Sequence, residues 1–132
     1  MTNEERALSI LDETAQYYNE DPSRRGYNEQ TGDCLYTAPS GGHCAFGRAM
    51  KEEYTTRPEA QCLYGIEELA TAVGCSSHDE MLKPEYKGFS VRFWRHLQML
   101  HDGNLYWSSE GITETGIRFL KRIRFKIRDG VL

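Results

Sequence analysis

Apolar residues recur at helical spacing in several segments of the chain. Between Leu8 and Tyr18 they lie three or four positions apart, which predicts an amphipathic helix over residues 2–19. Thr2 is a favourable N-cap, and Glu5 three positions later completes a capping box. The chain therefore opens with a helix whose first turn is set by its own side chains.

Three further helices are predicted by the same reasoning. One begins at Cys44, and a second runs over residues 66–73 with Gly74 as its C-terminal cap. A third begins near Ser90 and ends at residues 102–104. Its inward residues fall within about 100° of the helix surface: Phe93, Trp94, Leu97, Leu100 and His101.

The last segment has two interpretations. Ile123, Phe125 and Ile127 alternate with basic residues, which is typical of a strand. A helix beginning at Thr113 is favoured instead, because the apolar stripe extends back to Phe119 at helical spacing.

Residues 33–45 differ from these helical segments. Two short extended pieces flank Pro39-Ser40-Gly41-Gly42, which predicts a β-hairpin. The fold class is therefore α+β, with about five helices and a short hairpin near residues 33–45. A chain of 132 residues is long enough for one core, so we expect a single globular domain over residues 1–132.

Composition restricts the cellular compartment in which the protein is expected. The apolar share is 39% and the aromatic share is 11%, as expected of a folded chain. Its apolar runs are too short to cross a membrane, and residues 1–6 do not resemble a signal peptide. We expect a cytoplasmic protein whose four cysteines are reduced thiols.

Charge is unevenly distributed along the chain. Residues 1–90 carry eight Lys and Arg against sixteen Asp and Glu, whereas residues 91–132 carry eight against four. Such a basic segment can meet nucleic acid, nucleotide phosphates, an acidic protein surface or the chain's own acidic part. Six of the cations cluster near the end: Arg118, Lys121, Arg122, Arg124, Lys126 and Arg128.

A helix would divide these cations between two sides. With the apolar stripe inward, Arg118, Arg122 and Lys126 are predicted to face solvent and to bind a phosphate-bearing or acidic partner. Arg124 flanks the apolar stripe and is expected to pair with an acidic residue of the first 90 positions. The alternative is that the whole block only balances the acidic part of the chain.

Cys44, His101 and Asp102 are the candidates for catalysis. A thiol at a helix N-terminus is acidified by the unpaired N–H groups, a histidine could act as its base, and an aspartate could orient the ring. The structural interpretation makes Cys44 a small buried residue and His101 a hydrogen-bonded histidine. We favour the structural interpretation and keep a Cys-dependent hydrolase or transferase as the alternative.

A second candidate site surrounds the glycine pair. Gly42 and His43 precede a helix start whose N–H groups could hold an anion, with Arg48 closing over it. The competing interpretation is a turn that needs glycine for a positive φ.

Metal binding has only a partial signal in this sequence. Cys75-x-x-His78 has the spacing of a ligand pair, but a zinc site normally shows two such pairs. Further ligands would have to come from Cys34, His43, Cys44 and Cys62. We expect no metal and no cofactor.

The order of these motifs resembles a family of small proteins of tailed bacteriophages and prophages. The match consists of Cys34-x-Tyr36, Gly42-x-x-Cys-Ala-Phe-Gly-Arg, Leu97-Gln98-x-x-His101-Asp102 and Trp107. Phe46 replaces the usual isoleucine, and Lys51 stands where the family commonly has proline. The resemblance implies an origin more than a mechanism. If the protein is phage-encoded, we expect it in the cytoplasm of the host cell.

Together these features favour a phage-type accessory protein that binds without catalysis. We expect it to antagonise host defence, by sequestering a nucleotide ligand or by occluding an effector protein. Its expected partners are a host protein or a phosphate-bearing small molecule, with a second copy of the chain also open. A nucleic-acid-binding module that uses the basic C-terminal helix is a further alternative.

Overall fold

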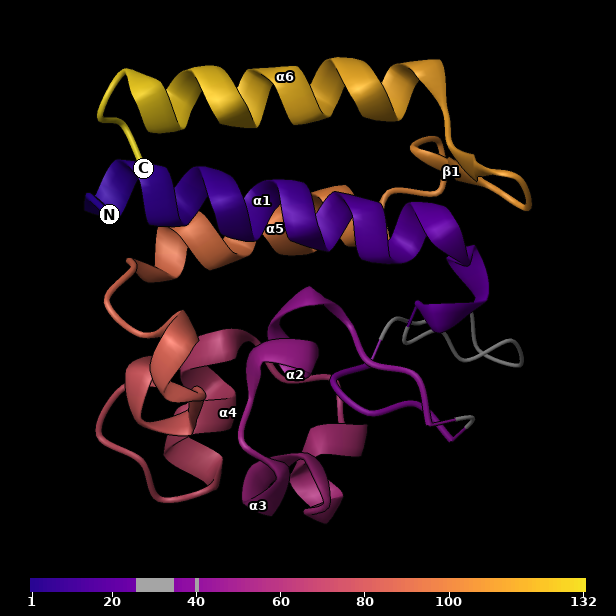
Figure 1. Ribbon diagram of the computed structural model, residues 1–132. Helices are drawn as coiled ribbons and strands as arrows, with labels where there is room; N and C mark the ends of the chain where they lie inside the picture. Colours follow the sequence, from indigo (N-terminus) through magenta and orange to yellow (C-terminus); the bar gives the residue numbers. More distant parts are fainter. Residues whose placement is uncertain (26–34, 40) are drawn as a thin grey trace.

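Three long helices form one side of the molecule and a group of short helices forms the other. The computed structural model describes residues 1–25, 35–39 and 41–132. Helices α1 (Asn3–Glu20) and α5 (Val91–Asp102) form the middle layer, and α6 (Glu114–Arg128) packs on them as the outer layer (Figure 1). The short elements are α2 (Ala45–Ala49), α3 (Glu52–Thr55), α4 (Ile66–Ala72) and the 3₁₀ turns Pro22–Arg24, Pro58–Gln61, His78–Met81 and Pro84–Tyr86.

Side-chain caps set the starts of the long helices. The Thr2 hydroxyl oxygen accepts the Glu5 N–H at 3.1 Å, and the Ser90 hydroxyl oxygen accepts the Phe93 N–H at 3.2 Å. Thr113 accepts the N–H of Gly116 at 3.1 Å in the same way. Each cap satisfies an N–H group that has no partner within the helix, so the predicted starts of these three helices are confirmed.

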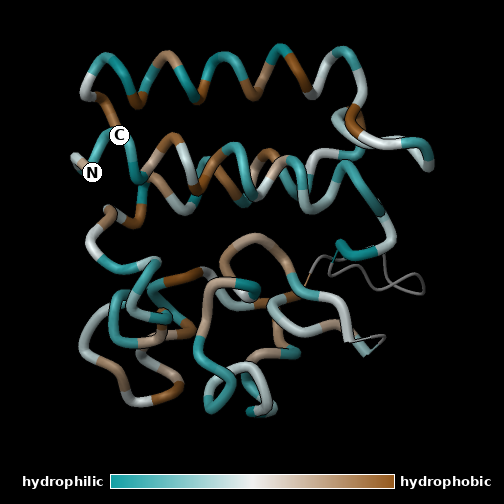
Figure 2. Tube along the Cα trace, in the orientation of Figure 1, coloured by the Kyte–Doolittle hydropathy of each residue, from teal (hydrophilic) through white to brown (hydrophobic). Residues whose placement is uncertain are grey.

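The last segment is a helix, as predicted, and not a strand. Ile123 and Ile127 are buried, whereas Phe125 between them is 67% exposed. A strand would have placed all three on one face. Figure 2 shows hydrophobic and hydrophilic residues alternating along α6, as expected of a helix with one buried side.

The predicted hairpin near residues 33–45 is wrong in position. Residues 35–39 and 41–45 contain no strand, and residues 33, 34 and 40 lie outside the described residues. The chain does reverse there, since the Ala38 N–H donates to the Gly42 carbonyl at 2.8 Å, and Gly41 has a positive φ of 91°. The Cys44 N–H also donates to the Leu35 carbonyl across the turn at 3.2 Å. However, the Thr37 N–H donates to the Ala60 carbonyl and the Thr37 hydroxyl to the Thr55 carbonyl, so Thr37 ties the turn to other segments, and the described residues of the turn form no strand ladder.

The paired strands lie before α6 instead. Strands β1 (Trp107–Ser108) and β2 (Gly111–Ile112) are antiparallel, with Trp107 opposite Ile112 and Ser108 opposite Gly111. The protein is thus mostly helical with a small two-stranded sheet, in agreement with the predicted α+β class. Among the described residues, the four-residue helix α3 is the α-helix that was not predicted.

The two strands fix the start of α6 against the middle layer. The Trp107 indole N–H donates to the Leu100 carbonyl at 2.7 Å, which ties the sheet to α5. The Ile112 N–H donates to Asn19 Oδ1 at 2.8 Å, which ties it to α1. These bonds determine the position from which α6 runs back along α1.

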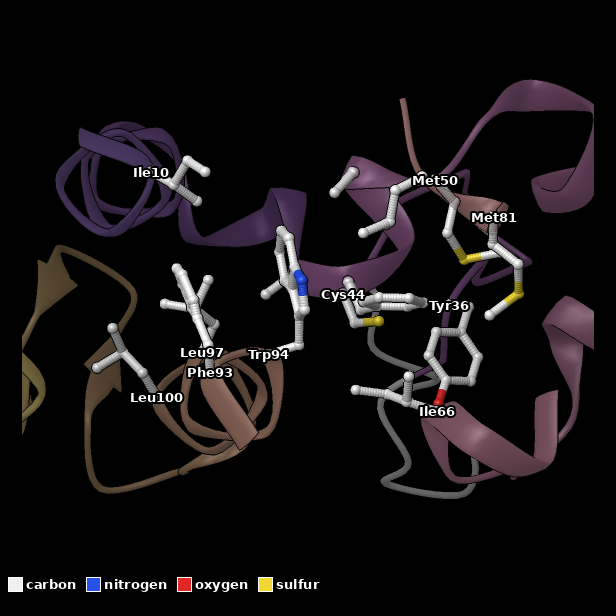
Figure 3. Close-up of a cluster of buried hydrophobic side chains, with 14 of the residues drawn as sticks. Ile10, Tyr36, Cys44, Met50, Ile66, Met81, Phe93, Trp94, Leu97 and Leu100 are labelled. Atoms are coloured by element: carbon white, nitrogen blue, oxygen red, sulfur yellow. The ribbon is translucent and has the colours of Figure 1, made fainter. Parts of the chain in front are cut away.

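One hydrophobic core joins the long helices to the short ones. Trp94 of α5, only 1% exposed, stacks on Phe93 with ring centroids 5.3 Å apart. It also meets Phe46 of α2 edge-on at 5.4 Å. Figure 3 shows Trp94 between the α5 side chains and a cluster that includes Cys44 and Tyr36. Residue 44 therefore lies inside the core.

Candidate functional site

The Cys44 thiol caps the N-terminus of α2 inside the core. Its sulfur accepts the Gly47 N–H at 3.4 Å and the Gln98 side-chain N–H at 3.3 Å. The residue is 1% exposed, and burial raises the pKa of the thiol to about 12. A protonated thiol without solvent access is a poor nucleophile. This geometry agrees with the structural interpretation of Cys44.

His101 and Asp102 meet at the end of α5. His101 Nδ1 lies 2.7 Å from Asp102 Oδ1, so these two members of the candidate triad are in contact. The His101 ring is 1% exposed and lies edge-on to Tyr18, with ring centroids 4.9 Å apart. Burial lowers the pKa of His101. Across the described ranges, no hydrogen bond joins His101 to Cys44, whose sulfur is bonded to Gly47 and Gln98.

Gly42 and His43 are packed against the backbone of neighbouring segments. A Cβ on Gly42 would lie 3.1 Å from the carbonyl oxygens of both Arg24 and Arg25, which explains why glycine fits there. His43 Nδ1 lies 2.8 Å from the Tyr36 carbonyl oxygen, and the Tyr18 hydroxyl donates to the His43 carbonyl at 2.6 Å. Gly42 and His43 thus link three segments of the chain.

The predicted anion site at the start of α2 has two of its donors engaged. The Phe46 N–H donates to Gln98 Oε1 at 2.9 Å, and the Gly47 N–H donates to Cys44. The Arg48 guanidinium pairs with Glu13 and lies over the Tyr17 ring, 4.5 Å from its centroid. An anion would have to replace the first two bonds and draw Arg48 away from α1.

Two cations of α6 are bound by neighbouring helices. Arg124 pairs with Asp12 of α1, which confirms the prediction that it contacts an acidic residue of the first 90 positions. Lys126 Nζ lies 3.3 Å from His96 Nε2 of α5, and its side chain is half-buried. Lys126 was predicted to face solvent, and this placement is wrong.

The wrong placement of Lys126 has a geometric cause. The buried side of α6 is centred on Gly116, Ile123 and Ile127, and Lys126 is only about 80° from that centre at 100° per residue. A Cβ on Gly116 would lie 2.4 Å from the Tyr106 carbonyl oxygen, so this residue must be close to the sheet.

The outward side of α6 carries four cations around an aromatic ring. Phe125 is 67% exposed, and four basic side chains near it are also exposed. Within the described part of the chain, none of the four has an ion pair. We call this surface the basic face, and it consists of Arg118, Lys121, Arg122, Phe125 and Arg128. Sequence reasoning missed Phe125, Lys121 and Arg128, which a helical projection centred on Gly116 would have placed there.

The remaining candidates add no site. Among residues 1–25, 35–39 and 41–132, no group of three or more His, Cys, Asp or Glu side chains could hold a metal ion. Cys44, Cys62 and Cys75 are free thiols, and Cys34 lies outside the described residues. No helix in these ranges is long and apolar enough to span a membrane.

Comparison with known proteins gives no further assignment. Tested against protein-family models, curated proteins and solved structures, the chain matches none of them.

Proposed function

We propose that this chain is a non-catalytic cytoplasmic binding protein whose basic face contacts an anionic partner. The observation that carries the proposal is the contrast within α6. Arg124 and Lys126 are bound by α1 and α5, whereas the cations of the basic face have no ion pair in the described ranges. Several like charges on one side of a helix focus a positive potential there.

The candidate catalytic groups support binding over catalysis. Cys44 is buried with its pKa raised to about 12, and its hydrogen bonds go to Gly47 and Gln98. Nucleophilic catalysis by cysteine needs an accessible thiolate close to a base. The basic face is exposed and needs no rearrangement to meet a partner.

The phage-like motif order suggests the setting in which binding occurs. We propose an accessory role in which the protein antagonises host defence by covering a partner. The face is the outer side of a helix, and the candidate anion site at α2 has two of its N–H groups engaged. These features favour covering a large anionic surface over enclosing a free nucleotide.

The proposal is tested first by retention on immobilised heparin, a general polyanion. We expect wild type to bind at low ionic strength although the net charge of the chain is −4. The variant Arg118→Glu/Arg122→Glu should elute much earlier, because it reverses two exposed charges of the basic face. Lys51→Glu is the control, since Lys51 lies beside α3, on the opposite side of the molecule from α6 (Figure 1). A wild-type protein that flows through at low salt refutes the proposal.

The accessory role needs a cellular test. Phage plating efficiency is measured on a bacterium that carries a defence system and expresses the chain. Wild type and Lys51→Glu should raise plating, and Arg118→Glu/Arg122→Glu should not. Equal plating with all three proteins, at equal expression, argues against a role for the basic face in antagonising that system.

A further inference from the structure

We infer that the basic face binds single-stranded nucleic acid, with a base stacked on Phe125 and the phosphates on the cations around it. This inference rests on the proposed function and names its partner class. Phe125 is the large apolar residue most exposed on α6, at 67%, and every other member of the basic face is a cation. An exposed aromatic ring beside cations is the arrangement that proteins use to hold unpaired bases.

The helix places cations on both sides of the ring. At 100° per residue, Arg118 and Arg122 lie on one side of Phe125, while Lys121 and Arg128 lie on the other. Lys121 and Arg122 are one turn before the ring and Arg128 is one turn after it, within reach of long side chains. A strand crossing α6 at Phe125 would therefore have cations near the phosphates on either side of the stacked base.

The surrounding charge favours a phosphate chain at this position. Residues 115–128 contain no Asp or Glu, so these residues of α6 contribute no carboxylate to the basic face. Residues 1–90 carry sixteen acidic residues against eight basic ones and would repel a polyanion. The charge distribution thus directs a nucleic acid to α6.

Two other partners fit this surface less well. A duplex keeps its bases stacked inside, so the Phe125 ring would have no base face to contact. A stable protein partner usually covers about 800 Å² on each side, with several apolar anchors. The basic face offers one exposed aromatic residue on a convex helix. Phosphate contacts give nucleic acid most of its affinity without a large apolar area.

The test compares three fluorescent probes by anisotropy: a 15-nucleotide oligo-dT, a 15-base-pair duplex and a polyglutamate peptide of 15 residues. We expect oligo-dT to bind most tightly. Four phosphate contacts to a single strand predict a slope of about −3 for log K against log salt concentration.

Phe125→Ala should weaken oligo-dT binding by about fivefold or more without changing this slope, and Phe125→Trp should retain binding. Arg122→Gln should make the slope shallower by about 0.7, and Lys51→Gln should leave it unchanged.

The outcomes separate this inference from the proposed function. Equal affinity for duplex and oligo-dT, or no effect of Phe125→Ala, overturns the inference. Polyglutamate binding as tightly as oligo-dT would point to an acidic protein partner, and the inference would fail while the proposed function stands. If no probe binds and heparin does not retain the protein, both fail. Circular dichroism checks that all variants, including the one at the half-buried Lys51, keep the helical content of wild type.

Discussion

Replacing Gly47 by alanine should destabilise the protein, although helix propensity predicts the opposite. Gly47 lies within α2, where alanine is normally favoured over glycine by about 1 kcal/mol. However, a Cβ at this position would lie 2.2 Å from the Tyr36 carbonyl oxygen and 2.9 Å from its carbonyl carbon. These are backbone atoms, so no side-chain rotation can relieve the overlap.

The contacts of Tyr36 set the size of the effect. Its carbonyl would have to withdraw by about 1 Å to reach ordinary contact with the new methyl group. His43 Nδ1 lies 2.8 Å from that oxygen, and the Tyr36 hydroxyl donates to the Tyr64 carbonyl at 2.6 Å. Overpacking costs about 1–3 kcal/mol, and each weakened hydrogen bond adds about 1 kcal/mol. Less the helix-propensity gain of about 1 kcal/mol, the expected loss in the free energy of unfolding is about 2–4 kcal/mol.

Urea denaturation followed by circular dichroism at 222 nm measures this loss. Gly65→Ala is the matched control, because Gly65 has a φ of −65° and an added Cβ would meet only the flexible Glu68 carboxylate, at 3.0 Å. We expect the control to stay within about 1 kcal/mol of wild type. If Gly47→Ala is as stable as the control, the close approach of α2 to Tyr36 does not exist in solution.

Two further predictions concern buried titratable groups, and one concerns the basic face. Burial lowers the pKa of His101, so its contribution to stability is complete above the ordinary histidine pKa of about 6.5 and falls as the pH drops below it. Urea midpoints at pH 5 and pH 7.5 should differ more for wild type than for His101→Gln, and an equal difference would contradict this. Iodoacetamide at pH 8 should modify the exposed Cys62 of the native protein and spare Cys44, whose pKa is raised to about 12. Peptide mapping that finds Cys44 modified first would restore the catalytic alternative. Arg118→Glu/Arg122→Glu should shift the melting temperature by only about a degree or two, because both side chains are exposed. A large drop would show that the basic face is structural.

Only part of the candidate site could be predicted from the sequence. The amphipathic stripe and its alternating cations identified α6 as a basic helix, and Arg124 was correctly expected to contact an acidic residue. The sequence could not show that Lys126 meets His96, thirty positions away. It also left open whether Cys44 was buried or accessible, because residue type and helix position are the same in both cases.

The sequence by itself determined where the long helices begin. Thr2, Ser90 and Thr113 each bond an N–H three residues ahead, so the signal is local and is present in the chain before it folds. The strands had no such local signal. In the turn before α6, Trp107 pairs with Ile112, and these two residues also bond to Leu100 and Asn19. In the earlier turn, Thr37 bonds to Thr55 and Ala60. Only the tertiary structure could decide between these two turns, because the competing hydrogen-bond partners come from segments far apart in the chain. The same contacts hold the start of α6 against α1 and α5, and in that position the basic face is exposed.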